Sequence, residues 1–216
     1  MQDSIIAASA LLVASSCVTL HLPQVAKPPE VKAGPLVGLD DPLDARPSTR
    51  VALYMFGWIS VDYKIDTGDL VEHVRSLMQQ ELASHGFRTI ATSESKSSNV
   101  PRSVSVRITK AEMWDSGLLF IMSHVQNPVA DATLGVVVRD QSTHELFSRT
   151  YIGTSAAQGT HQAPTLNQSI VSAVGATPGS ITPGPWYEHQ VSWALDEAVW
   201  RAVNDPAFDA AINTSP

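Results

Sequence analysis

The chain has 216 residues, with 14 Lys and Arg against 21 Asp and Glu, so its formal net charge is −7 with neutral histidines. That length fits one domain with an extended arm, and it is enough to bury a core. Hydrophobic residues make up 44% and charged residues 16%, which excludes a disordered acidic chain. No basic stripe is present to neutralise phosphates, which argues against nucleic-acid binding. A single cysteine excludes an internal disulfide and multi-cysteine metal sites.

Residues 5–14 are apolar and are followed by Ser15, Ser16 and Cys17. Such a segment has the length of the apolar part of a secretory signal and is too short to span a membrane. The small residues before Cys17 resemble the bacterial lipobox, although Ala14 stands where Leu is usual and no base precedes the segment. The resemblance implies that residues 1–16 are a signal peptide and that Cys17 is acylated. The alternative is a buried first helix with a core cysteine.

Residues 17–49 contain six prolines, at positions 23, 28, 29, 35, 42 and 47. Because proline fixes φ and removes an amide donor, this density forbids a regular helix and favours an extended segment. We therefore expect a lipidated, proline-rich tether over residues 17–49 and a single folded domain over residues 50–212. Val18, where an Asp would favour retention in the inner membrane, implies the outer membrane by the sorting rule of the lipoproteins that carry a lipobox.

The domain begins with strand and helix signals. Residues 51–59 are apolar on both alternations, which predicts a strand that is covered on both faces or paired centrally in a sheet. Capping residues at 66–69 then precede apolar residues at helical spacing from Leu70 to Leu82, and Gly86 ends that helix. A polar loop is expected over 93–99. Further strands are expected over 87–90, 103–109, 118–126, 132–139 and 145–154.

Helical patterns return in the last fifty residues. We expect helices over 165–174 and 187–203, separated by a Gly/Pro-rich loop over 175–185. Asp205 with Pro206 predicts the N-cap and first position of a final helix through Ile212. Together these elements predict an α+β fold, an antiparallel β-sheet meander with helices packed mainly on one face.

Four short motifs support a family resemblance, namely 82–87 (LASHGF), 103–108 (SVSVRI), Asp131-Ala132 and 205–208 (DPAF). With this order of elements, the chain resembles the YajG-like bacterial lipoproteins and, more distantly, small periplasmic accessory lipoproteins. The resemblance covers about residues 50–212 and implies a fold and a place on the periplasmic face of the outer membrane. It implies no set of catalytic residues.

Motifs for common cofactors and reactions are missing from the sequence. It has no glycine loop for dinucleotides, no P-loop and no zincin helix, and its seven histidines show no ligand spacing. We expect no cofactor, no metal site and no enzymatic activity. A Ser–His–Asp triad assembled from distant residues stays open, and with it the hypothesis of a periplasmic hydrolase.

Tryptophans mark a candidate binding face on the last long helix. Trp193 and Trp200 are seven residues apart and share a helix face that overlaps Trp186. The face is either core or an exposed site for a partner or an acyl chain, and we expect Trp200 to be buried and Trp193 to lie at the rim. The leading hypothesis is a lipoprotein that binds another envelope protein in envelope assembly or maintenance. The second is a lipid- or glycolipid-handling accessory subunit of an envelope transport system.

Overall fold

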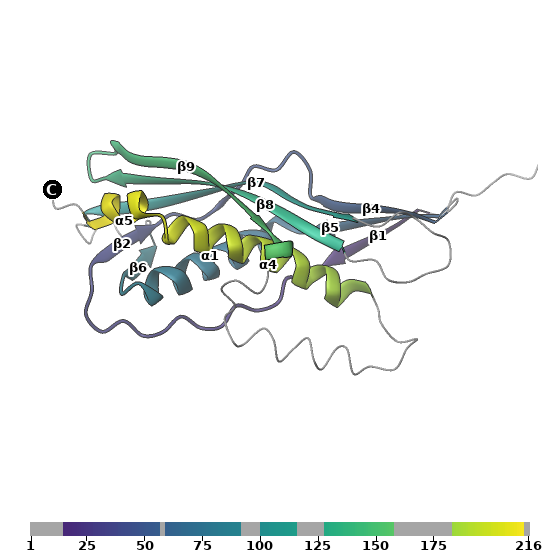
Figure 1. Ribbon diagram of the computed structural model, residues 1–216, viewed down its shortest axis with the longest axis horizontal. Helices are drawn as coiled ribbons and strands as arrows, with labels where there is room; N and C mark the ends of the chain where they lie inside the picture. Colours follow the sequence, from purple (N-terminus) through teal and green to yellow (C-terminus); the bar gives the residue numbers. More distant parts are fainter. Residues whose placement is uncertain (1–14, 57–58, 92–99, 116–127, 158–182, 214–216) are drawn as a thin grey trace, which may run out of the picture.

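The computed structural model describes residues 15–56, 59–91, 100–115, 128–157 and 183–213, and their strands form two sheets (Figure 1). Sheet A has the order β1-β5-β4, with β1 (Ser15–Leu20), β5 (Ile59–Ile65) and β4 (Arg50–Phe56). Sheet B has the order β6-β2-β7-β8-β9, and β3 also pairs with β7. Its strands are β2 (Leu36–Leu39), β3 (Leu43–Asp44), β6 (Arg88–Ala91), β7 (Arg102–Asp115), β8 (Pro128–Asp140) and β9 (Glu145–Thr154). The polar loop at 93–99, the strand at 118–126 and the helix at 165–174 lie outside the described residues.

The expected antiparallel meander is correct only for part of the fold. Strands β7, β8 and β9 form such a meander, and β4 is antiparallel to β5. In contrast, β1 is parallel to β5, β2 is parallel to both β6 and β7, and β3 is parallel to β7. All three strands that make the sheets mixed come from residues 15–44, which precede the predicted start of the folded domain at residue 50.

The segment 17–49 is therefore not the solvated tether that its prolines suggested. Leu20, Val37 and Leu39 are buried in the hydrophobic core, and the path between β1 and β2 packs against that core through Leu22 and Val25. Proline excludes helix here, as predicted, but none of the six prolines lies within β1, β2 or β3, so the short segments between them still pair with other strands. Residues before Arg50 thus belong to the packed body of the protein.

The long pair β7–β8 shows how alternation and a bulge place the core. Along β7, Val104, Val106 and Ile108 are buried, and their neighbours face outward. The register with β8 shifts between Ile108 and Lys110, and beyond it the buried positions become Ala111 and Met113. A β-bulge adds one residue and so moves the apolar set by one position while keeping it on the same face.

Helices cover one side of sheet B (Figure 1). Helix α1 (Thr67–Ser84) is capped by Asp66, whose side chain accepts from Gly68 N at 2.7 Å, and it ends before Gly86 at φ +83°, as the sequence predicted. Helix α4 (Pro183–Val203) begins inside the expected loop 175–185, because proline is tolerated in a first helical turn. Helix α5 (Pro206–Asn213) starts after Asp205, which accepts from Ala207 N at 2.8 Å. A short 3₁₀ helix, η1 (Ser155–Ala157), follows β9.

Helix α4 approaches sheet B closely at one glycine. A Cβ atom on Gly153 of β9 would lie 2.0 Å from the Ala194 carbonyl oxygen and 2.5 Å from the Ala198 nitrogen. Both atoms belong to the backbone of α4, so a rotamer change cannot relieve the overlap. Gly153 therefore sets the distance between α4 and β9.

Candidate functional site

Cys17 lies on an outer strand of sheet A, where its side chain is exposed and free of any disulfide. It pairs with Asp62 of β5, and three residues later the strand reaches fully buried Leu20. An exposed thiol at this position is accessible to modification, while Leu20 at the end of β1 is held in the core. Within the described ranges no helix is long and apolar enough to cross a membrane, and no group of three metal-ligating side chains is found.

In the predicted aromatic face, the structure reverses the burial that we expected for Trp193 and Trp200. Trp193 is buried, with 5% of its surface exposed, whereas Trp200 is partly exposed. The ring of Trp193 stacks on His189, with centroids 5.7 Å apart. The side chain of Trp186 is outside the described residues. The expectation was wrong because α4 is buried on almost every side between Gln190 and Val199, so distance from the Gly/Pro-rich segment does not predict exposure.

A buried serine–histidine pair lies between the two long helices. Ser192 Oγ of α4 is 3.0 Å from His73 Nε2 of α1, and both residues are buried. The carbonyl of Pro23 accepts a hydrogen bond from the same imidazole, so the ring proton points to Pro23 and Nε2 accepts from the serine hydroxyl. Burial lowers the pKa of His73 to about 4, more than the Pro23 hydrogen bond raises it. His73 is thus neutral at pH 7 and links α1 and α4 to Pro23 of the segment 17–49.

This pair differs from a catalytic triad in its third member. The group that orients His73 is a backbone carbonyl, and Asp69, one turn earlier on α1, instead contacts His21 at 2.7 Å. A triad needs a carboxylate to stabilise the imidazolium that forms during catalysis, and burial here opposes that charge. The geometry therefore describes a structural link inside the core.

Sequence reasoning missed His73, although the signal was available. The residue lies three positions after Leu70 and four before Leu77, on the apolar face of the helix that the pattern predicted. A polar side chain at such a position must find a partner in the core. The partner, Ser192, is 119 residues away in sequence, and no spacing rule connects the two.

A second polar cluster lies where the chain passes from sheet B to sheet A. Arg46 is buried and donates through Nε and Nη2 to both carboxylate oxygens of Asp44, at 2.9 and 2.8 Å. Asp44 also accepts from Thr67 Oγ1 at 2.8 Å, and Arg46 Nη2 donates to the Ile65 carbonyl. Burial works to raise the pKa of Asp44, but the hydrogen bonds from Arg46 and Thr67 outweigh it and leave that pKa below its ordinary value.

A shallow depression lies beside this ion pair. It is lined by Arg46, Pro47, Ser48, Arg50, Thr109, Lys110, Ala111 and Glu112. Its cations already face carboxylates, because Arg50 pairs with Asp62 and Lys110 lies 3.3 Å from Glu112. The depression therefore has no uncompensated positive charge with which to hold an anion.

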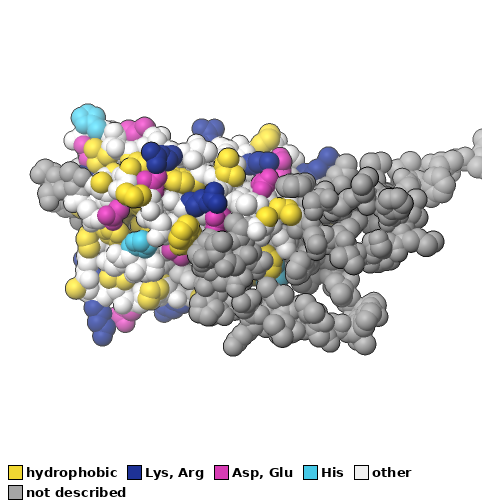
Figure 2. All heavy atoms as spheres, viewed as in Figure 1, with side chains coloured by type: hydrophobic (Ala, Val, Ile, Leu, Met, Phe, Trp, Pro, Cys, Tyr) yellow, Lys and Arg dark blue, Asp and Glu magenta, His cyan; other side chains and the backbone are white. Residues whose placement is uncertain are grey.

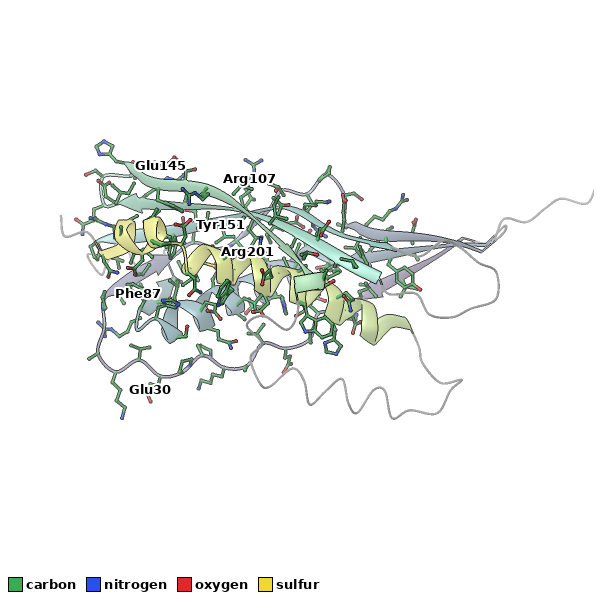
Figure 3. All side chains as sticks on the ribbon, in the orientation of Figure 1. Glu30, Phe87, Arg107, Glu145, Tyr151 and Arg201 are labelled. Carbon is green, nitrogen blue, oxygen red and sulfur yellow. The ribbon has the colours of Figure 1, made fainter. Side chains whose placement is uncertain are left out.

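Charged side chains also fix the outer contacts of the helices. Arg201 of α4 donates to the Ile152 carbonyl of β9 at 3.1 Å, and Tyr151 donates to Asp205 at 2.7 Å (Figure 3). Burial, followed by the bond to Asp205, raises the pKa of Tyr151 well above its ordinary value. On the face with the helices, hydrophobic side chains are interspersed with charged ones (Figure 2).

Comparisons with known proteins give likenesses of fold only. No family model matches the chain, and no curated protein matches it. Among solved structures, the chain is similar to a Xanthomonas campestris protein of the DUF330 family, with a TM-score of 0.46, 12% identity, and 87% of this chain and 90% of that chain covered. It is also similar to the Helicobacter pylori homolog of a neuraminyllactose-binding hemagglutinin, with a TM-score of 0.45, 9% identity and 90% and 98% coverage. A third is lipoprotein GNA1162 from Neisseria meningitidis, with a TM-score of 0.35, 12% identity and 65% and 94% coverage. Likenesses at this level carry no argument about function.

Proposed function

We propose that the chain is a bacterial lipoprotein that is acylated at Cys17, faces the periplasm from the outer membrane, and binds a partner in the cell envelope without catalysing a reaction. The observation that carries the proposal is the position of Cys17. The cysteine is exposed. In the sequence it follows the apolar segment 5–14 and the small residues Ser15 and Ser16, and it lies on β1, whose last residue, Leu20, is buried. Acyl chains of a lipoprotein contribute about 0.8 kcal/mol per buried CH₂, which makes anchoring by several chains stable.

Cleavage before Cys17 is compatible with the fold. It would remove Ser15 and Ser16 from β1, and residues 17–20 would keep their pairing with residues 62–65 of β5. Because Leu20 is part of the core, the anchor would be joined to the packed domain by only a few residues. We therefore expect a domain held close to the membrane, where a long free tether would have let it move away.

Replacement of the thiol tests this proposal. In Cys17→Ser, acylation should be lost, and the chain should remain as precursor or leave the membrane fraction. Intact-mass measurement of the wild type should show a chain that begins at Cys17 and carries added acyl mass. Thr19→Ser, two residues further on the same exposed strand, is the matched control and should fractionate like the wild type. A wild-type mass without acyl groups would refute the proposal.

We propose partner binding over catalysis because two polar sites of the described residues are accounted for by contacts within the chain. The serine–histidine pair is buried and structural, and the depression near Arg46 is neutralised by its own carboxylates. The alternative of an acyl site under α4 receives no support at Gly153, where the helix backbone lies directly against β9. Crosslinking of the membrane-attached protein followed by mass spectrometry is the experiment that identifies the partner. Recovery of the chain without a reproducible crosslinked protein would contradict the role.

A further inference from the structure

Residues 21–25, which follow β1, are fastened to both long helices by polar contacts. The backbone N–H of His21 donates to Glu188 Oε1 of α4 at 2.9 Å. The ring of the same residue lies 2.7 Å from Asp69 Oδ2 of α1. The segment forms no helix or strand, and Figure 1 shows the chain between β1 and β2 passing along α1.

Two residues further on, the segment contacts a buried group. The carbonyl of Pro23 accepts from the His73 ring, whose Nε2 lies 3.0 Å from Ser192 Oγ. Only 6% of the surface of His73 is exposed. Movement of Pro23 away from α1 would leave one ring nitrogen without its partner and would admit water to the ring.

Little apolar burial holds the segment in place. Leu22 and Val25 are only partly buried, and His21 and Gln24 are exposed, whereas Leu20 at the end of β1 is fully buried. Segments with few buried apolar contacts and no regular structure open locally at a lower free energy than the whole fold. Residues 21–25 can therefore leave the helices while Leu20 keeps β1 in the core.

Protons favour the open form through His73. In the closed form burial lowers the pKa of His73 to about 4, whereas a histidine ring in water titrates at about 6.5. The open form therefore binds a proton more readily between these values. By linkage, the ratio of open to closed segment rises about 20-fold between pH 7 and pH 5.

Other titratable groups lie near His73 or Ser192 along each element. These are His21 of the segment, Asp69 and Glu72 of α1, and Glu188, His189 and Asp196 of α4. Protonation of His21 acts in the opposite direction, because an imidazolium is attracted to Asp69. The carboxyl groups are set aside by working between pH 7 and pH 5, above the range in which carboxyls generally titrate. Burial also lowers the pKa of His189, so a variant at that position serves as a control.

We infer that segment 21–25 is a pH-dependent clasp, which opens from α1 and α4 on acidification while both sheets stay folded. Opening uncovers the His73–Ser192 pair, so the junction of the two helices is covered at neutral pH and becomes accessible in acid. The inference is independent of the acylation of Cys17, because none of the contacts that carry it involves that residue.

Native-state cleavage by thermolysin tests the clasp in the full chain. Cleavage of the Gln24–Val25 bond is followed by mass spectrometry at pH 7 and pH 5. Its rate is divided by that of a synthetic peptide of residues 18–33 at the same pH, which removes the pH dependence of the protease. Because such cleavage follows the population of the open form, we expect the normalised rate to rise about 20-fold in the wild type, while cleavage within β8 stays slow.

Variants assign the effect to one histidine. In His73→Gln the rise on acidification should be absent, although cleavage at pH 7 should be faster than in the wild type, because glutamine fits the two partners less well. His21→Asn, on the segment itself, is the matched control and should keep the rise. His189→Gln, on α4, should keep it as well.

Each contrary outcome overturns the inference. A normalised wild-type rate that does not change with pH shows that acid does not open the segment. Equal acceleration at Gln24–Val25 and within β8 means that acid unfolds the whole chain. A rise of wild-type size in His73→Gln assigns the effect to another group. If His73→Gln fails to fold, long-range ¹H–¹⁵N spectra of the wild type at pH 6 replace it. A neutral His73 ring with its proton on the nitrogen that faces Pro23 then supports the inference, and a protonated ring overturns it.

Discussion

The β7–β8 pair and the β4–β5 pair are both antiparallel, but the hydrophobic patterns of their sequences differ. Along β8, alternate residues from Ala130 to Val138 are fully buried, and the residues between them are partly exposed. In β4–β5 the uncharged run from Val51 to Val61 continues through both alternations. The first pattern is explained by α4 on one face and water on the other. The second fits β5, which lies between β1 and β4 in sheet A.

The two sheets also differ in the elements that pack against them. Helix α4 packs against β7, β8 and β9 and joins α1 through the His73–Ser192 pair. Among its described side chains, sheet A contributes Leu20, Val51, Ala52, Tyr63 and Ile65 to the core. We therefore expect substitutions under α4 to change the free energy of unfolding.

The largest effect is expected at Gly153. A β-branched side chain in Gly153→Val must displace the backbone of α4, since its Cβ would lie 2.0 Å from the Ala194 oxygen. Overpacking ordinarily costs about 1–3 kcal/mol, and a clash with backbone exceeds that range, so we expect loss of the folded state or of most of its stability. Urea unfolding followed by circular dichroism measures it.

Gly135→Val on β8 is the matched control. A Cβ there meets only Arg107 atoms at 3.9 Å, on the exposed face of the sheet (Figure 3). Its unfolding midpoint should stay close to that of the wild type. Equal losses in the two variants would show that α4 does not lie against β9 at Gly153.

Trp193 and Trp200 of α4 give the next largest effect and test how completely the helix is covered. Trp193→Ala should cost about 3–5 kcal/mol, as truncations of large buried aromatics do. Trp200→Ala, on the same helix but partly exposed, should cost clearly less. Thermal unfolding alongside partner capture separates the roles. A larger loss of stability at Trp200 than at Trp193 would reverse the assignment made from the structure.

Sequence reasoning predicted the elements whose signals are local. The α1 boundaries follow from Asp66 and Gly86, the final helix from Asp205, and the β8–β9 pair from two strand patterns around a short turn. The expected strand at 118–126 lies outside the described residues, and the direct pairing of β7 with β8 was not predicted. It did not predict that residues 15–44, most of them in the proline-rich segment, supply β1, β2 and β3. Parallel pairing is formed between segments far apart in sequence, such as β2 and β7, and a strand of four residues carries too little periodicity to be seen.

The candidate site divides in the same way. Exposure of Cys17 agrees with a sequence signal that needs only adjacent residues, although acylation itself stays a prediction. Burial of Trp193 and the pairing of His73 with Ser192 depend on three segments meeting in space. Helical spacing placed Trp193 and Trp200 on one face, but it could not say what packs on that face.

The smallest of the expected effects concerns acid and the link between α1 and α4. The pKa of His73 is about 4 in the folded protein against about 6.5 when unfolded, so the unfolded chain binds the proton more readily in between. The stability linked to His73 is therefore fully present above about pH 6.5. As the pH is lowered toward 4, the free energy of unfolding falls, by about 3 kcal/mol for this residue. The lowered pKa of His189 adds a loss of the same sign, whereas Asp44 and Asp205, whose pKa values are also lowered, lose their contribution only as the pH falls below about 3.8.

Urea unfolding of the wild type and of His73→Gln, each at pH 7 and at pH 4.5, isolates the contribution of His73 to the pH dependence of stability. The variant should be less stable at pH 7, because glutamine fits the Pro23 and Ser192 partners less well, yet it should lose less stability on acidification. Equal losses on acidification in the wild type and in His73→Gln would mean that His73 is protonated as easily in the folded protein as in the unfolded chain. The buried link between the arm, α1 and α4 would then have to be open to water.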